Sequence, residues 1–386
     1  MLIYIILILI VIAYLFIKKT DRNLKIYLGF VTLTMILIVG LRDISVGKVD
    51  TEYIYTPRIM KYFQYTYQQL WNFQTKDKIF YVVTKFLSNI YENINFVLFV
   101  IGIPFIMSII HLIRKYSHNV CMSIICFLGL QYFTMSFFLL RQVIAMAFCI
   151  YAFDALVENK KTKFVIFVIL GSLFHQTCLV FLLAYPLSKL EKGIKQWCVV
   201  IGAFLISLFA EQLVRLSIFK TLNILLGEST RYSNYEFSES GLGYTGFIIQ
   251  LCVFLCVSYI YYGKKNLVDN KEANRVFVIK FRRLSTKKQM EMRNSVILEE
   301  QSRIMYNLAT ISLIFMAFSS IIGEFWRVSS YFGIYNIILL PNAISTIKNR
   351  KTRVQINLLI GIIMVLYFLF IHLDNAQALP YKFFWN

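Results

Sequence analysis

Long apolar runs separated by short polar and basic stretches occupy most of the chain. A helix that crosses a bilayer needs about 20 mostly apolar residues. Runs of this kind predict about ten spanning helices, over Leu2–Ile17, Ile26–Leu41, Ile94–Ile113, Val120–Leu139, Arg141–Val157, Trp197–Leu216, Tyr244–Tyr262, Ile304–Ile322, Val328–Ile347 and Val354–His372. The pattern therefore predicts an all-α polytopic integral membrane protein, with residues 1–386 as a single transmembrane domain.

One further apolar run, Phe164–Leu187, does not fit a simple crossing. Basic residues flank it on both sides, at Lys160–Lys163 and at Lys189–Lys195. If both flanks are cytoplasmic, the chain must enter the bilayer and return, and two arms of about 11 residues each reach about 16 Å, half of a bilayer. This predicts a re-entrant helical hairpin with its tip at Gly171–Gln176. A normal crossing, with another boundary misplaced, is the alternative.

Charge sets the orientation of the spans. The chain has 40 Lys and Arg against 20 Asp and Glu, and the cations gather in short loops between apolar runs. Such clusters mark cytoplasmic loops of membrane proteins, so no nucleic-acid partner is predicted. No cleavage site follows the first run, which predicts a retained helix and both termini outside. Residues 42–93 and 217–243 are then extracytoplasmic segments, and 263–303 is a basic cytoplasmic loop near membrane lipid.

Arginines beside the hydrocarbon are the clearest candidate site residues, because a charge there is costly. Arg141 lies between two apolar stretches of the sequence. The other candidates near the predicted outer face are Arg42, Arg231 and Arg327. A guanidinium matches phosphate oxygens in bidentate fashion, so a converging set predicts a lipid-linked pyrophosphate ligand. A snorkelling role for Arg141 and a simple Glu324–Arg327 pair are the alternatives.

Proton transfer and sugar binding require other side chains. Histidine has an unperturbed pKa near neutral, so His175 is the candidate general base, with Asp50 as the second candidate; a packing role for His175 is the alternative. Carboxylates beside aromatic rings suit sugars, although they also occur as interfacial belt residues. The candidate sugar-binding residues are Tyr53, Tyr232, Tyr235 and Glu324. Asp-x-Asp, P-loop and metal-ligand motifs are absent from the sequence, so neither a metal nor a cofactor is predicted.

Several of these residues occur in an order that resembles the EpsG family of exopolysaccharide polymerases. The motifs are Gly40-Leu41-Arg42 followed by Gly47, Asp50, Thr51 and Tyr53, then Arg141 with Ala145 and Ala152, Leu173-Phe174-His175, Arg327 with Tyr331, and Pro380-Tyr381-Lys382-Phe383. The resemblance covers nearly the whole chain. One departure is that Gly47 and Asp50 stand farther apart than the family's Gly-x-Asp.

The resemblance implies a GT-C-like helical bundle that acts as a Wzy-like polymerase of exopolysaccharide, capsule or O-antigen. Such an enzyme transfers a growing glycan from undecaprenyl pyrophosphate to a lipid-linked repeat unit, outside the bacterial cytoplasmic membrane. It implies an inverting, metal-independent glycosyltransferase, with His175 as base and Arg141 stabilising the leaving pyrophosphate, and a chain-length regulator as partner. A flippase or transporter of the same lipid-linked oligosaccharide, a glycan ligase and a membrane acyltransferase are the alternatives.

Overall fold

The computed structural model describes residues 1–18, 20–47, 51–72, 78–191, 193–215, 242–262 and 286–385. Within these ranges the regular elements are helices, and the β pairing is one isolated bridge between Arg42 and Phe383. The predicted all-α class is therefore confirmed. The chain forms two compact units, unit 1 from Met1–Leu182 with Ile344–Asn386 and unit 2 from Leu183–Ala343. The predicted single domain over residues 1–386 stays a prediction.

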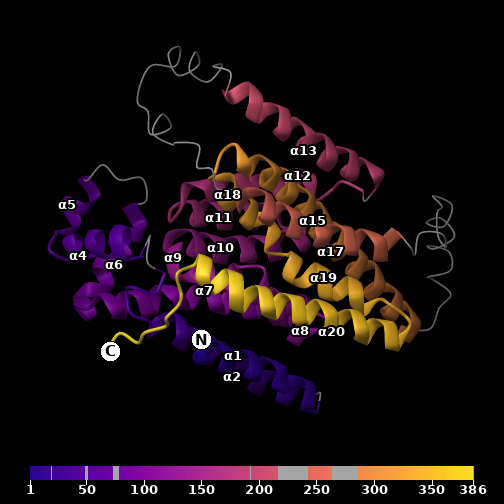
Figure 1. The fold of residues 1–386 in the computed structure, drawn as a ribbon, viewed down its shortest axis with the longest axis horizontal. Coiled ribbons are helices and arrows are strands. Elements are labelled where there is room, and N and C mark those ends of the chain that lie inside the picture. Colours follow the sequence, from indigo (N-terminus) through magenta and orange to yellow (C-terminus); the bar gives the residue numbers. More distant parts are fainter. Residues whose placement is uncertain are drawn as a thin grey trace. The chain divides into compact units, whose positions relative to one another are not determined.

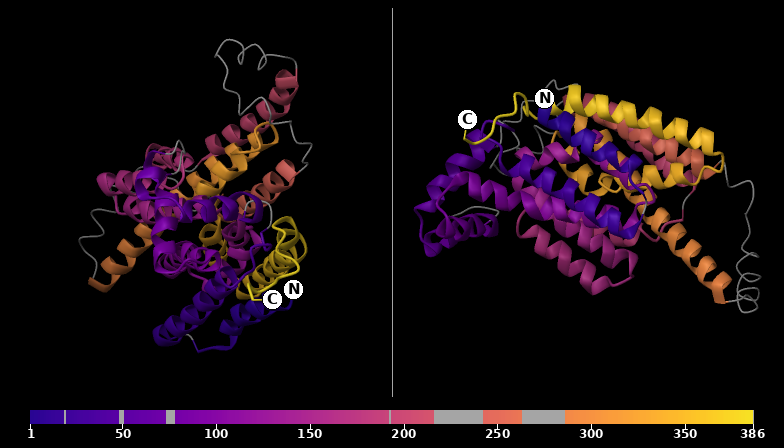
Figure 2. Two further views of the ribbon diagram at one scale, coloured as in Figure 1. Left: turned by 90° about the vertical axis from the view of Figure 1, so that its left-hand side faces the viewer. Right: turned by 90° about the horizontal axis from the view of Figure 1, so that it is seen from below.

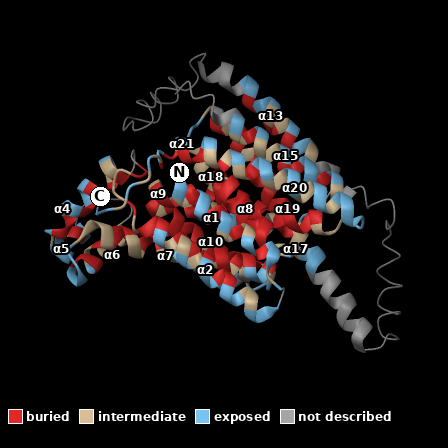
Figure 3. Cartoon of the chain, turned by 60° about the horizontal axis from the view of Figure 1, so that its bottom comes forward, coloured by how far each residue is buried: buried red, intermediate tan, exposed pale blue. Residues whose placement is uncertain are grey.

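Unit 1 holds most of the long apolar helices, which Figure 1 shows in sequence colours. Its main elements are α1 (Leu2–Ala13), α2 (Asp21–Gly40), α7 (Ile94–Tyr116), α8 (Val120–Gly129), α9 (Tyr132–Phe138), α10 (Leu140–Val157), α11 (Lys161–Ser172) and α20 (Arg350–Tyr367). Every residue of α8 and most residues of α10 are buried, whereas α20 exposes much of its surface (Figure 3). The apolar exterior of α20 is what a lipid-facing helix requires.

Four described helices are long and apolar enough to cross a membrane: Asp21–Gly40, Ile94–Tyr116, Leu140–Val157 and Arg350–Asn375. A bent pair, α8 with α9, adds a fifth candidate. Shorter apolar helices occupy Leu2–Phe16, Gln176–Leu187, Gln196–Phe209, Thr245–Tyr261 and Asn336–Ser345. The helices support a polytopic membrane protein, while the predicted number of about ten spans stays a prediction.

The predicted span Val120–Leu139 is two helices and not one. α8 and α9 are bent by 48° relative to each other. The cause lies at their junction, where Gln131 has a left-handed φ of 72° that an α-helix cannot contain. Gly129 precedes it and packs so closely on α20 that an added Cβ would lie 2.6 Å from the Cβ of Met364. This break turns the chain before it enters α10.

The predicted extracytoplasmic segment 42–93 is largely helical in its described part. It contains a π-helical turn (Thr51–Tyr55), α4 (Thr56–Phe63), α5 (Tyr67–Asn72) and α6 (Lys78–Ile90). α4, α5 and α6 gather at one end of α7 (Figures 1 and 2). Buried aromatic residues of this segment, among them Tyr55 of the π-helical turn and Phe80 of α6, form one apolar cluster with Leu140 and Ile144 of α10. The segment is therefore anchored to the start of α10 by its own core.

The predicted hairpin run is interrupted where its tip was expected. α11 ends at Ser172, and a 3-10 helix begins at Gln176 and continues to Leu183. The break thus falls within Gly171–Gln176 and places His175 between two helical pieces. The re-entrant path itself stays a prediction.

Both ends of the chain lie at the same end of unit 1 (Figure 2). The Tyr4 hydroxyl donates to the carbonyl of Ala378 at 3.2 Å, and the Tyr4 and Tyr381 rings meet edge to face at 5.7 Å. The two termini therefore share one side if the unit spans a membrane, as the charge pattern predicts.

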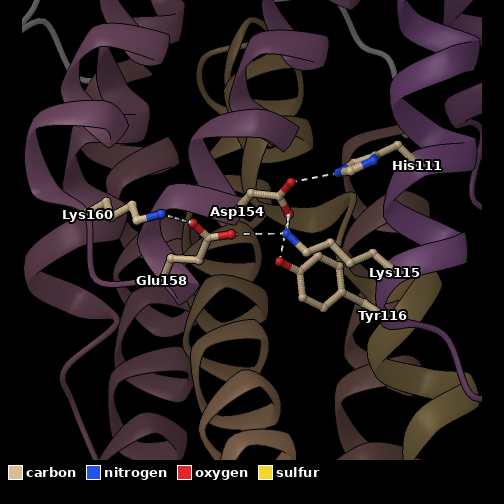
Figure 4. A network of polar contacts seen from close by, with 6 residues as sticks. All are labelled: His111, Lys115, Tyr116, Asp154, Glu158 and Lys160. Atoms are coloured by element: carbon tan, nitrogen blue, oxygen red, sulfur yellow. Dashed lines mark hydrogen bonds and ion pairs between the residues drawn. The ribbon is translucent and has the colours of Figure 1, made fainter.

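A polar network joins α7 to α10 at the opposite end of α10 from Arg141, and Figure 4 shows its six residues. Asp154, with a side chain only 15% exposed, is the shared acceptor. One carboxylate oxygen lies 2.6 Å from Nε2 of His111, and the other accepts from the Tyr116 hydroxyl at 2.6 Å and lies 3.1 Å from Lys115 Nζ. Glu158 extends the network outward, where its bond to Lys160 holds the pKa of that carboxyl below its usual value.

Replacing Asp154 by asparagine should destabilise unit 1, because the amide cannot satisfy the same donors. We expect a loss of about 1–3 kcal/mol, the cost of unpaired, largely buried polar groups. Thermal unfolding of the purified protein in detergent measures it. The matched control is Glu158→Gln, whose side chain is 40% exposed and which should change stability by less than about 0.5 kcal/mol. Equal melting temperatures for both variants would show that the network contributes no stability.

Unit 2 contains the remaining described helices. They are α12 (Ala184–Leu187), α13 (Ile194–Arg215), α15 (Leu242–Tyr262), α17 (Thr286–Ala317), α18 (Phe325–Gly333) and most of α19 (Asn336–Ser345). The hydroxyls of Ser312 and Ser329 lie 2.8 Å apart and join α17 to α18. Of the predicted loops, residues 217–241 and 263–285 lie outside the described residues, and α17 already begins within the predicted basic loop.

Candidate functional site

Arg141 lies in the first turn of α10, directly after the break that ends α9. Its position opposes the helix dipole, since a cation near a helix N-terminus costs about 0.3–1 kcal/mol. Helix stability therefore does not explain an arginine here. Tyr55 provides compensation: Nε of Arg141 donates to the Tyr55 hydroxyl at 3.2 Å, and the guanidinium carbon lies 5.3 Å from the centre of the Tyr55 ring.

Tyr55 is itself held rigidly. It is 5% exposed, and its ring packs at 5.8 Å against that of Phe80 on α6. Sequence reasoning singled out Tyr53 in this turn, but Tyr53 is 64% exposed and projects from the other side. Thr51 and Tyr55, four residues apart, lie on the buried face of this turn. Sequence periodicity gave no signal for this arrangement.

His175 lies at the same level of the structure as Arg141. α10 and α11 form an antiparallel hairpin, and Gly171 packs so closely on α10 that an added Cβ would lie 3.2 Å from the Ala145 carbonyl oxygen. Arg141 lies four residues before Ala145 in α10, and His175 lies four residues after Gly171. In an antiparallel pair these two steps run in the same direction. Their backbones are therefore level to within about one helical turn of 5.4 Å.

Hydrogen bonding and ring packing hold the backbone of His175 in place. Its N–H donates to the carbonyl of Gly171 at 3.1 Å, which continues the last turn of α11. The neighbouring Phe174 ring stacks on Phe148 of α10 at 5.7 Å, and both rings pack against the apolar cluster that contains Tyr55. The same core thus positions the arginine–tyrosine pair and the histidine.

Arg42 has a different environment from Arg141. It is 1% exposed, it donates to the carbonyl of Val39, and its Nη2 donates to the carbonyl of Phe137 at 3.2 Å. Burial lowers the pKa of the Arg42 guanidinium to about 10, so it stays charged at neutral pH. The sequence predicted a pyrophosphate contact, whereas the structure directs this guanidinium to backbone carbonyls.

The other predicted site residues are elsewhere. Arg327 and Glu324 lie in unit 2, where they form an ion pair at 3.2 Å, so the predicted pairing alternative is confirmed. Arg327 also lies over the Trp326 ring at 5.6 Å. The remaining candidates, Asp50, Arg231, Tyr232 and Tyr235, lie outside the described residues.

One further carboxylate was missed in the sequence. Glu52 lies in the same π-helical turn as Tyr55, and within the described structure its buried Oε2 has no hydrogen-bond partner. A lone glutamate in a polar, tyrosine-rich stretch gave no signal in the sequence. The described part of the chain contains no group of three His, Cys, Asp or Glu residues placed to bind a metal ion.

These elements define a helical membrane protein in which Arg141 contacts Tyr55 and lies about level with His175 in unit 1. The chain belongs to the EpsG family, whose model matches residues 25–383, nearly the full length. This confirms the resemblance predicted from the motifs and makes the chain a membrane protein of polysaccharide biosynthesis. No curated protein and no solved structure matches it.

Proposed function

We propose that this protein is a Wzy-like polysaccharide polymerase, which transfers a growing glycan from undecaprenyl pyrophosphate to a lipid-linked repeat unit. Family membership supports the polysaccharide class. The observation that carries the proposal further is the Arg141 guanidinium, oriented by Tyr55 at the start of a helix and level with His175. An anion site beside a proton acceptor is what glycosyl transfer from a pyrophosphate requires.

Arg141 binds the pyrophosphate in this proposal. Tyr55 orients the guanidinium through its Nε, and the planar fork of an arginine matches phosphate oxygens in bidentate fashion. The N-terminus of α10 adds its own attraction for anions. Charge that develops on the leaving pyrophosphate is thereby stabilised in the transition state. Arg327 and Arg231 are proposed as further pyrophosphate-binding residues.

His175 is proposed as the general base. The acceptor sugar hydroxyl attacks the anomeric carbon of the donor and transfers its proton to the imidazole of His175. The bond from the anomeric carbon to the pyrophosphate oxygen breaks, and the pyrophosphate leaves with the electron pair. Attack opposite the leaving group inverts the anomeric centre. Asp50 is the second candidate for the base.

Sugar contacts are proposed for four residues. Tyr53 presents an aromatic ring that is 64% exposed, at the turn that also holds Tyr55. An exposed ring face offers a flat apolar surface to the C–H groups of a pyranose. The other three proposed sugar-binding residues are Tyr232, Tyr235 and Glu324.

The reaction is proposed to occur at the outer face of the bacterial cytoplasmic membrane, with both termini outside and a chain-length regulator as partner. Positive loops at the other ends of the spans support this orientation. A cysteine at exposed position 53 should react with an impermeant thiol reagent on whole cells, in a background without the exposed Cys198, Cys252 and Cys256. Protection of that cysteine would place the site inside.

Purified protein in lipid, supplied with a pyrophosphate-linked repeat unit, tests the function directly. A ladder of products that differ by one repeat unit is the expected result. Transfer of single units without a ladder would indicate a ligase. Movement of the lipid-linked glycan across liposomes without turnover would indicate a transporter, and acyl transfer in place of glycosyl transfer would indicate an acyltransferase.

A further inference from the structure

The carbonyl of Phe137 lies at the end of α9, just before α10, and contacts the segment that follows α2. We call this segment, described over residues 41–47 and 51–55, the first loop. The Phe137 carbonyl is in the last turn of α9, where helix carbonyls have no intrahelical donor. Nη2 of Arg42 donates to this oxygen at 3.2 Å, and the hydroxyl of Thr51 donates to it as well. Two side chains from the first loop thus cap a helix 86 to 95 residues further along the chain.

Arg42 caps two helices at once. Its other donor, Nη1, bonds to the Val39 carbonyl in the last turn of α2. A cation at a helix C-terminus is favoured by the helix dipole, and here one guanidinium serves the ends of both α2 and α9. The first loop therefore fixes where α9 stops.

Gly47 allows the backbone of the first loop to approach the Phe137 carbonyl closely. Its φ is +84°, which favours glycine, and an added Cβ would lie 2.6 Å from the Phe137 carbonyl oxygen. Its N–H donates to the Gln377 carbonyl at 3.2 Å. A side chain at this position would push the loop away from the oxygen that Arg42 and Thr51 bind.

We propose that Arg42, Gly47 and Thr51 are positioning residues that set the Arg141 guanidinium; this rests on the proposed function. Both partners of the arginine–tyrosine pair depend on them. Arg141 follows Phe137 by four residues across the break between α9 and α10, and Tyr55 follows Thr51 by four residues in the π-helical turn. Anchoring Thr51 to Phe137 therefore fixes the distance between Tyr55 and Arg141.

A double-mutant cycle tests whether Thr51 acts through Arg141. Thr51→Val removes the hydroxyl at nearly constant volume and should lower kcat for ladder formation about tenfold, the scale of one buried hydrogen bond. Thr51→Ser should restore most of the rate. In the Arg141→Lys background, Thr51→Val should cost less than about twofold. The same tenfold loss in both backgrounds, or no loss in the wild type, would overturn the proposal.

A spectroscopic readout separates this proposal from the proposed function. Fluorotyrosine placed at position 55 reports on the guanidinium beside its ring, whether or not the protein turns over substrate. Thr51→Val should shift the fluorine resonance, whereas Thr34→Val should not, because the Thr34 hydroxyl bonds within α2 to the carbonyl of Phe30. An unmoved resonance in Thr51→Val would reject the positioning role. A moved resonance in a protein that forms no ladder would keep it and reject the polymerase.

Discussion

Arg141→Lys should reduce the rate of polymer formation by about 100-fold, on the scale of losing one preorganised donor to a developing anion. Lysine keeps the charge but loses the planar fork that binds two phosphate oxygens. It also loses the Nε–H that donates to Tyr55, so its ammonium is no longer oriented. Initial rates of ladder formation by the purified variant measure the effect.

The matched control for this variant is Arg22→Lys, at an exposed position of α2. It makes the same chemical change away from the site, and its initial rate of ladder formation should equal that of the wild type. Tyr55→Phe should have an intermediate effect of about tenfold, because the ring remains under the guanidinium while the hydroxyl acceptor is lost. Wild-type rates for Arg141→Lys would remove Arg141 from the site and favour a snorkelling role.

His175→Gln should lower kcat by about 100-fold or more, because a positioned general base contributes about 10² to 10⁴ in rate. Glutamine retains hydrogen-bonding capacity and similar bulk, so the break after α11 should persist and the melting temperature should change little. Initial rates of ladder formation by the purified variant measure this loss.

His118→Gln is the matched control, since His118 lies between α7 and α8 and contacts the Ser345 hydroxyl at 3.3 Å. It should leave the rate unchanged. If His175→Gln kept the wild-type rate, the base would be another residue, such as a carboxylate. Glu52 would then be the first residue to replace, because its buried oxygen lies in the turn that holds Tyr55, followed by Asp50.

The positions of the helices could be predicted better from the sequence than their breaks. Apolar runs gave Ile94–Tyr116 and Leu140–Val157 to within a few residues, because hydropathy reports directly on burial or lipid exposure. The bend before Tyr132 could not be predicted in this way. It depends on a left-handed Gln131, a residue type with no strong preference for that conformation.

The candidate site was predictable in its chemistry and less so in its partners. Arg141 was evident because a charge inside an apolar run is costly. The role of Arg42 could not be derived from the sequence, since its acceptor is a backbone carbonyl 95 residues away. Every residue has such a carbonyl, so no residue type indicates which one accepts the bond. Choosing Tyr55 over Tyr53 required knowing which face of the turn is buried against α6 and α10. The pairing of Glu324 with Arg327 was accessible, because residues three apart on a helix are neighbours.

Backbone hydrogen bonds join the first loop to residues 382–384. The final form of this loop therefore depends on residues that are synthesised much later than the loop itself. The Asp43 N–H donates to the Lys382 carbonyl at 2.9 Å, and the Phe384 N–H donates to the Leu41 carbonyl at 3.1 Å. Tyr381 and Ile38, which also bond, are separated by 343 residues. The Arg42 loop therefore cannot reach its final form while the ribosome is still synthesising the intervening helices.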